Sequence, residues 1–292
     1  MGNFVNLVLF GLTDGVIYAA VALGLVLIFR ATRAINFAQG AMATITTYIA
    51  VTLIDKGLSY WIALLGAIVS GFIIGAIAER VFMRPVERRS PLNAVIVAIG
   101  LLIALEAAAG MIWGAKYRQF PSYFSIVGFR VGHSRIAFSN FDLYVLVSVA
   151  VIMVLLVLLF RYTDLGLKMR AAAFAPETAR LLGVRVGRML TLGWALAVAL
   201  GAVAGVLLAP QVLLYPNNMD VVNIYGFVAA ILGGLDSPVG AVVGGLAMGL
   251  IVSLVGGYLG SSLEAMGALV ILLVVLVIRP EGLFAQRSAR RV

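Results

Sequence analysis

The chain has 292 residues, of which 63% are hydrophobic and 11% charged, and its net charge is +9. Soluble domains are about 45–50% apolar and about 25% charged, so this composition excludes an ordinary soluble protein. The absence of Cys excludes disulfides and cysteine metal sites, and a single His excludes a paired-histidine zinc site. In such a chain the positive charge favours basic loops beside a membrane over binding of nucleic acid.

Apolar runs long enough to cross a bilayer recur along the sequence, without the period-two alternation of a barrel strand. We therefore predict an all-α polytopic membrane protein, a single transmembrane domain over residues 1–292 with about eight or nine passes. The first run is too long for the apolar core of a signal peptide, so we expect it to be retained. The expected full spans are 4–29, 61–81, 92–113, 143–160, 190–214, 241–258 and 266–278.

Two apolar segments are too short to cross alone. Residues 41–54 would extend about 21 Å as a helix, against a hydrocarbon core of about 30 Å. We expect this segment to recruit the preceding AINFAQG stretch, either as a helical extension or as a broken re-entrant start. Residues 224–235 run into a glycine-rich turn, so we predict a broken or half-depth element near 221–240, buried in protein or facing a wet cavity.

The basic residues predict the orientation of the chain. Most of the 21 Lys and Arg fall in four segments that we place in the cytoplasm: 30–35, 80–91, 162–189 and 279–292. The positive-inside rule then puts the N-terminus outside and the C-terminus inside. The basic segment 114–141 is the exception, and we interpret it as an external cap with a possible small hairpin over 124–131.

Ionisable and polar residues inside spans are candidates for function. A charge at mid-bilayer costs about 2.5–3.5 kcal/mol on insertion scales, so a carboxyl there must pair, meet water or serve a pathway. Uncharged amides suit either a neutral polar path or a helix break. The candidates for the translocation path or for a helix break are Asp14, Asn36, Gln39, Glu106, Gly233, Gly234, Asp236 and Ser237.

Pairs of glycines four residues apart predict close approach of helices in lipid. Such pairs are Gly11/Gly15, Gly71/Gly75, Gly110/Gly114, Gly201/Gly205, Gly240/Gly244 and Gly245/Gly249. The chain has no G-x4-G-K-[ST] motif, so an ATPase that drives it would be another chain.

The polar segment 164–189 is basic and has a helical pattern between two spans. Within it Glu177, Ala179 and Gly183 have the spacing of the EAA---G coupling motif of ABC importer permeases. Further motifs make the chain resemble the branched-chain amino-acid ABC importer permeases, specifically the subunit type that carries NFAQG, over residues 8–284. These motifs are G11LxxG15xxY18AxxA22LG24, N36FAQG40, G166xxxR170A171, A204GV206, L232GGL235, S237xxG240AxxGG245 and R279PEGLF284.

The resemblance implies a subunit of a bacterial inner-membrane importer. The partners would be a paralogous permease, two cytoplasmic ATPases that bind ATP and Mg²⁺, an external solute-binding protein in the periplasm, and membrane lipid, but no nucleic acid. This chain itself would bind no cofactor and would not be an enzyme. The cytoplasmic segment 162–189 would couple to the ATPases through Gly166, Arg170, Ala171, Glu177, Ala179 and Gly183.

The sequence departs from the family pattern at Ala41, Thr46, Thr47 and Asp236, which leaves the solute open among branched-chain or other hydrophobic amino acids, amides and urea. An alternative reading is an ion-coupled transporter or channel that uses Asp14 and Glu106. A membrane-embedded enzyme is disfavoured because no nucleophile and base can be combined from the residues present.

Overall fold

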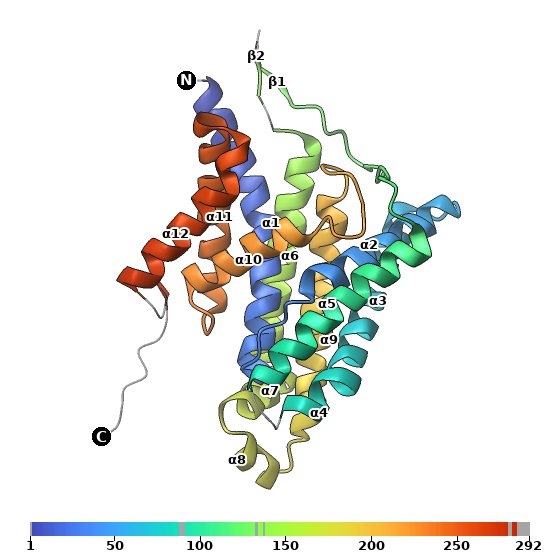
Figure 1. Cartoon of the computed structure of the whole chain (residues 1–292), viewed down its shortest axis with the longest axis vertical. Coiled ribbons are helices and arrows are strands. Elements are labelled where there is room, and N and C mark those ends of the chain that lie inside the picture. Colours follow the sequence, from blue (N-terminus) through green and yellow to red (C-terminus); the bar gives the residue numbers. More distant parts are fainter. Residues whose placement is uncertain (1, 88–90, 132–133, 137, 280–281, 285–292) are drawn as a thin grey trace.

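The computed structural model describes residues 2–87, 91–131, 134–136, 138–279 and 282–284, and it is almost entirely helical (Figure 1). Several residues used in the sequence analysis lie outside the described part: Arg88, Arg89, His133, Pro280, Glu281 and the basic tail after Phe284. The elements in chain order are α1 (Gly2–Thr32), α2 (Gln39–Asp55), α3 (Tyr60–Ile77), the π-helical turn η1 (Ala78–Met83), α4 (Arg84–Glu87), α5 (Pro91–Trp113), β1 (Arg130–Val131), β2 (Ser134–Arg135), α6 (Asn140–Tyr162), α7 (Asp164–Phe174), α8 (Pro176–Leu181), α9 (Val186–Leu208), α10 (Asp220–Gly233), α11 (Pro238–Leu259), the 3₁₀ turn η2 (Ser261–Leu263) and α12 (Glu264–Ile278).

Seven of the described helices are long and apolar enough to cross a bilayer, which confirms the predicted class of polytopic helical membrane protein. Two further segments, α2 and α10, have 17 and 14 residues. At about 1.5 Å per residue they extend about 26 Å and about 21 Å, less than the hydrocarbon core. The number of complete crossings and the orientation stay predictions.

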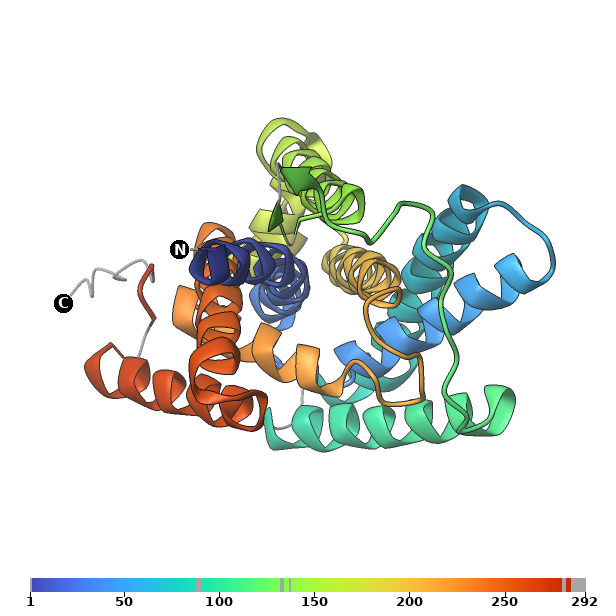
Figure 2. The same ribbon diagram turned by 90° about the horizontal axis from the view of Figure 1, so that it is seen from above.

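Helix α1 is the centre of the bundle. It is apolar all round, as expected for a helix enclosed by others, and most side chains from Val16 to Ile28 are buried. It packs against α11, α9 and α10, and less extensively against α6 and α7. Seen from above, the other helices surround it or lie to one side in a second group made of α2, α3 and α5 (Figure 2).

The predicted glycine pairs explain how closely α1 approaches α11. A Cβ on Gly11 or Gly15 would lie 2.9 Å from the backbone of α11, at Leu250 and Leu246 respectively. On the facing side, a Cβ on Gly245 or Gly249 would collide with the backbone of α1. Two glycine pairs therefore meet at one helix crossing, where only glycine lets the two backbones touch.

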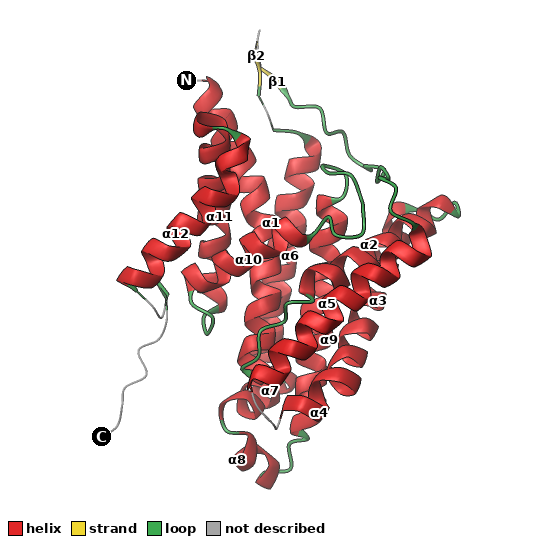
Figure 3. Ribbon diagram, viewed as in Figure 1, coloured by secondary structure: helices red, strands yellow, loops and turns green. Residues whose placement is uncertain are grey.

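The AINFAQG stretch before α2 was expected to be either a helical extension or a broken start, and the structure shows a break. Residues 34–38 are not helical, and α2 begins at Gln39, so the chain breaks rather than extending the helix toward α1. The hairpin expected over 124–131 was misplaced, because the two paired strands are Arg130–Val131 and Ser134–Arg135. The long segment that carries it, 114–139, lies at the end of the bundle where the N-terminus is found (Figure 3).

Candidate transport site

The loop between α6 and α9 folds into two short helices at the end of the bundle opposite the N-terminus (Figure 1). Thr163 caps α7, since its hydroxyl accepts a hydrogen bond from the Gly166 backbone N–H at 3.1 Å. Gly166 is buried, and a Cβ there would collide with the backbone of α6 at Leu159 and Phe160. The glycine thus allows the chain to reverse sharply and α7 to pack back on α6.

The six residues predicted for coupling divide into two groups in this loop. Gly166 and Ala179 are buried and Ala171 is half-buried, so these three position the loop from inside. Arg170, Glu177 and Gly183 are exposed, and Glu177 pairs with Arg180 at 2.6 Å. Gly183 has a φ of +81°, which favours glycine and ends the turn after α8.

The loop also presents large apolar side chains that the motif reasoning missed. Phe174, Leu181 and Leu182 are 93%, 88% and 79% exposed at the ends of α7 and α8. Their only signal in the sequence is that they are large apolar residues inside a polar island. Large exposed apolar side chains on one short loop suit contact with another protein; we refer to Phe174, Leu181 and Leu182 as the apolar tip.

An ion pair between a buried carboxylate and a half-buried arginine connects the C-terminal end of this loop to the end of α3. The fully buried Glu79 lies in the π-helical turn and accepts two hydrogen bonds from Arg84, at 2.9 and 2.8 Å. Arg84 also donates to the Gly187 carbonyl at 2.7 Å, and the Thr191 hydroxyl donates to Glu79 at 2.7 Å. Residues 187 and 191 lie in the first two turns of α9, so this network fixes the start of α9 against the end of α3.

A second group of polar residues is buried where α2, α9 and α10 meet. This polar seam consists of Asn36, Gln39, Thr44, Asn218 and Asn223, all of which are buried and none of which is charged. It joins two of the residues predicted for the path, Asn36 and Gln39, to two asparagines that the sequence analysis did not single out.

Hydrogen bonds organise the half of the polar seam next to the break. The Asn36 side-chain amide donates to the Gln39 side-chain oxygen at 3.1 Å, and Gln39 donates to the Ala197 carbonyl of α9 at 2.8 Å. Gly24 and Gly201 make room for Gln39, because a Cβ at either position would come within 3 Å of its amide nitrogen. Glycines on two helices therefore leave space for one buried amide.

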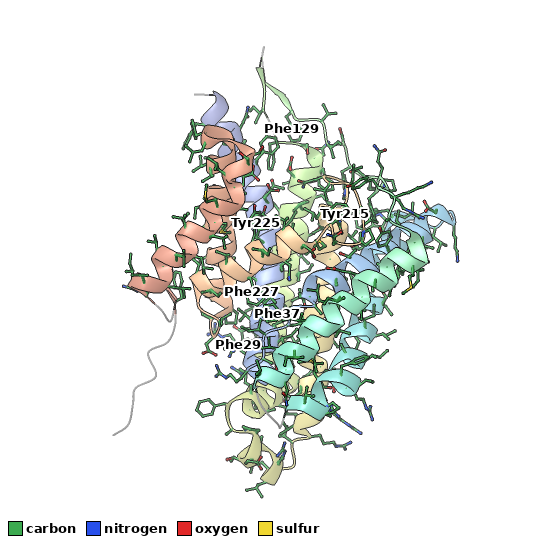
Figure 4. All side chains as sticks on the ribbon, in the orientation of Figure 1. Phe29, Phe37, Phe129, Tyr215, Tyr225 and Phe227 are labelled. Atoms are coloured by element: carbon green, nitrogen blue, oxygen red, sulfur yellow. The ribbon has the colours of Figure 1, made fainter. Side chains whose placement is uncertain are left out.

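The other half of the polar seam is less completely hydrogen-bonded. Thr44 donates to the Asn218 side-chain oxygen at 3.1 Å, and Asn223 donates to the Phe37 carbonyl at 3.3 Å. The Asn218 amide nitrogen and the Asn223 amide oxygen have no partner among the described residues, although buried polar atoms are nearly always paired. The rings of Phe37 and Phe227 stack at 5.3 Å beside the break, which fixes α10 to the segment before α2 (Figure 4).

The turn between α10 and α11 contains the remaining predicted break residues. The backbones of Gly233 and Gly240 touch, and Gly234 has a φ of +98°. Ser237 caps α11 by accepting a hydrogen bond from the Gly240 N–H at 2.9 Å. Asp236 pairs with Arg33 at 2.6 Å, with both side chains more than half exposed, so it ties this turn to the end of α1.

The two carboxyls inside spans lie on different helices, Asp14 on α1 and Glu106 on α5. Asp14 is half-buried in α1, in the electrostatic field of Asp142 and Glu264. Glu106 on α5 faces the carboxyl of Asp220, the first residue of α10, in side-chain hydrogen-bond contact. The ion pairs of the described residues include neither Asp14 nor Glu106. No group of three His, Asp or Glu that could hold a metal ion occurs in the described part of the chain.

Comparisons with known proteins find relatives that match almost the whole chain. A family model described as a branched-chain amino acid transport system permease component matches residues 7–278. The high-affinity branched-chain amino acid transport system permease protein LivH of Escherichia coli K12 is 32% identical, over 97% of this chain and 96% of that protein. The corresponding permease protein BraD of Pseudomonas aeruginosa is 31% identical over the same shares, and a probable LivH of Methanocaldococcus jannaschii is 29% identical over 90% of this chain and 86% of that protein.

Proposed function

The chain belongs to the family of permease components of branched-chain amino acid transport systems, and from this premise we propose its solute class, partners and working surfaces. It is a multi-pass transport subunit of the bacterial inner membrane, of the type found in ABC importers. The solute would be a branched-chain or other hydrophobic amino acid or a related amide. The observation that carries this proposal is the match over residues 7–278, with relatives aligned along nearly their full length.

The energy source would be separate ATPase subunits. With a paralogous permease, this chain would form the translocation path, and two cytoplasmic ATPases would bind ATP and Mg²⁺ while an external solute-binding protein delivers the solute. The chain itself would bind no cofactor and catalyse no reaction, which agrees with the missing G-x4-G-K-[ST] motif. An ion-coupled transporter or channel is not favoured, because the relatives are permease components of ABC transporters.

The apolar tip would be the main contact with an ATPase subunit. Phe174, Leu181 and Leu182 are almost fully exposed, and the Glu177–Arg180 pair lies between them in sequence. Buried aromatic and apolar anchors, with polar residues around them, provide most of the energy of protein interfaces. In this proposal the loop 162–189 lies in the cytoplasm, and Gly183 forms the turn that leads from α8 to α9.

Two contacts would carry motion from this loop into the bundle. α7 packs on α6 through Gly166, and the start of α9 is held to α3 by Arg84 and Glu79. An ATPase that moves the loop would therefore displace α6 and α9 together. The moving α9 is the helix whose Ala197 carbonyl receives the hydrogen bond from Gln39.

The polar seam would line part of the path. It is uncharged, it lies where two short helices meet, and it holds two polar atoms that lack partners among the described residues. Irregular backbone at membrane depth is tolerated beside a water-filled cavity, and short broken helices are typical of solute sites in transporters. Opening the path would give those two atoms water or solute as partners.

The test is ATP-dependent uptake into proteoliposomes that contain this chain and its partner subunits. Truncating an interface anchor costs about 2 kcal/mol or more, and every 1.4 kcal/mol is about tenfold in affinity. The variant Phe174→Ala/Leu181→Ala should therefore bind the ATPase at least about 100-fold more weakly, and ATP-dependent uptake should be lost. The matched control Leu155→Ala/Leu158→Ala removes exposed apolar side chains from α6 instead and should transport normally.

Two results would contradict different parts of the proposal. Robust uptake by the purified chain alone, driven by an ion gradient, would overturn the assignment as an ABC permease. Normal ATPase binding by Phe174→Ala/Leu181→Ala would overturn only the apolar tip as the docking surface. Gly183→Arg is a less specific probe, because its positive φ adds backbone strain to any change in docking.

A further inference from the structure

A groove of about 370 Å³ lies between α1, α6 and α11, and α7 closes one end of it. α1 lies between the other two helices, as the view from above shows (Figure 2). The walls of the groove are apolar, with Leu23 and Leu27 from α1, Met153 and Leu156 from α6, and Val242 from α11. We call it the arginine groove, because three arginines also line it.

The three arginines gather at the α7 end of the groove. They are Arg30 from α1, Arg161 from the last turn of α6 and Arg170 from α7. Arg30 and Arg170 also line a smaller cavity beneath α7, so they stand where the two spaces meet. Arg30 is half-buried and lies within the electrostatic field of Arg170 and Arg33.

These arginines are not neutralised by the protein around them. The ion pairs among the described residues use other arginines: Arg33, Arg84 and Arg180. Asp236 is the acidic residue whose field reaches Arg30, but its carboxylate is already paired with Arg33 at 2.6 Å. Arg30 is half-buried, whereas Arg161 and Arg170 are exposed. Like charges brought together repel one another, and the partial burial of Arg30 adds a desolvation cost, so the site favours an anion that several arginines can share.

The geometry of the groove identifies the kind of anion. Arg30 lies seven residues beyond Leu23, and Arg161 lies eight beyond Met153, so the apolar walls extend about 10–12 Å from the arginines toward the middle of the bilayer. The rim is open sideways and apolar, since Val157 and Val239 are 55% and 69% exposed. An acyl chain would lie in such a trough while its headgroup stays at the level where α1 and α6 end.

We propose that the arginine groove binds an anionic phospholipid, with its phosphate on Arg30, Arg161 and Arg170 and an acyl chain along the apolar walls. A free phosphate would leave the walls unused. A zwitterionic amino acid or phospholipid would leave its ammonium or choline group without a partner, because none of the described residues that line the groove is Asp or Glu. Basic pockets between membrane helices are a known type of anionic-lipid site.

The lipid would have a structural consequence for the loop 162–189. Arg170 comes from α7, whereas Arg30 and Arg161 come from the two long spans behind it. A phosphate held by all three would tie α7 to the bundle one turn beyond its contact with α6 at Gly166. Lipid binding in the arginine groove does not depend on which solute is transported, but it does rest on the proposed location in the membrane. The lipid would lie in the leaflet on the α7 side.

The test uses the delipidated full-length chain in neutral detergent and measures retained lipid by native mass spectrometry. Phosphatidylglycerol should bind at least about tenfold more tightly than phosphatidylcholine, and inorganic phosphate or glycerol phosphate at equal concentration should not compete. Arg30→Gln/Arg170→Gln should remove that preference. The control Arg185→Gln/Arg188→Gln removes two exposed charges from the same end of the protein and should retain it.

A second variant separates the groove from its charge. Val239→Trp fills the trough at an exposed position and leaves every arginine in place, so it should weaken phosphatidylglycerol binding severalfold without unfolding the chain. The proposal would be overturned if the two lipids bind equally well or if free phosphate competes with phosphatidylglycerol. It would also be overturned if the control Arg185→Gln/Arg188→Gln binds phosphatidylglycerol as weakly as Arg30→Gln/Arg170→Gln does. Loss of the lipid when the partner subunits assemble would also overturn it, since a protein would then be the natural occupant.

Discussion

The Glu79–Arg84 pair makes a prediction at the level of single residues. Glu79 is fully buried and depends on Arg84, whose side chain is 38% exposed. Removing one partner of a buried pair costs about 3–5 kcal/mol, and partial exposure of Arg84 places Arg84→Met near the lower end of that range. Thermal melting of the full-length chain in detergent should fall clearly for Arg84→Met, and hardly at all for Arg80→Met, which alters an exposed arginine of the same segment.

A double variant distinguishes lost charge pairing from lost packing. Replacing a buried ion pair by apolar residues of similar size is often nearly neutral. Glu79→Leu/Arg84→Met should therefore have a higher melting temperature than Arg84→Met, although both variants lack the hydrogen bond from Arg84 to the Gly187 carbonyl. If the double variant is less stable than Arg84→Met, then Arg84 does not stabilise the protein mainly by neutralising the Glu79 carboxylate.

This pair also marks where sequence reasoning failed at the residue level. Glu79 and Arg84 are five positions apart, and an α-helix brings residues three or four apart together. The π-helical turn Ala78–Met83 rotates them into contact, and nothing in the sequence announces that turn. Glu177 and Arg180 follow ordinary helical spacing, yet their pair could not show that the apolar tip beside it would be exposed.

At the level of elements, the crossing of α1 and α11 gives a second prediction. Gly245→Val would place a branched side chain against the backbone of α1 at Ala19, whereas Gly100 on α5 has open space around it. Overpacking costs about 1–3 kcal/mol and more where backbone must move. Gly245→Val should lower the melting temperature and the yield of monodisperse protein on size-exclusion chromatography, and Gly100→Val should change neither. Equal behaviour of the two variants would contradict the close crossing.

The elements divide into those that hydropathy could place and those that it could not. The long spans were predictable because an apolar run of membrane length has no other stable form in lipid. α2 and α10 were predictable as short, but their meeting in the polar seam was not, because Asn218 and Asn223 look like ordinary loop and helix residues until the fold buries them. The same holds for Asp220, which faces Glu106 from a helix more than a hundred residues away.

The whole molecule makes a prediction about sidedness that the absence of cysteine renders easy to test. Single cysteines at the exposed positions Lys56 and Thr178 mark the two ends that we place outside and in the cytoplasm. A membrane-impermeant maleimide should label Lys56→Cys in spheroplasts and should label Thr178→Cys only after the membrane is disrupted. The reverse pattern would invert the orientation inferred from the basic loops.

The central position of α1 has a consequence for the way the protein is made. Its closest partner is α11, and the Ser253 hydroxyl donates to the Leu7 carbonyl across 246 residues of sequence. At about 5–20 residues per second, the first helix enters the bilayer roughly 12–50 seconds before its partner is synthesised. During that interval α6, α9 and α10 can already pack on α1, but its glycine surface stays uncovered because α11 is the helix that fits it. A chain that stops before α11 would keep that surface open, which makes it a natural signal by which membrane quality control could recognise an unfinished protein.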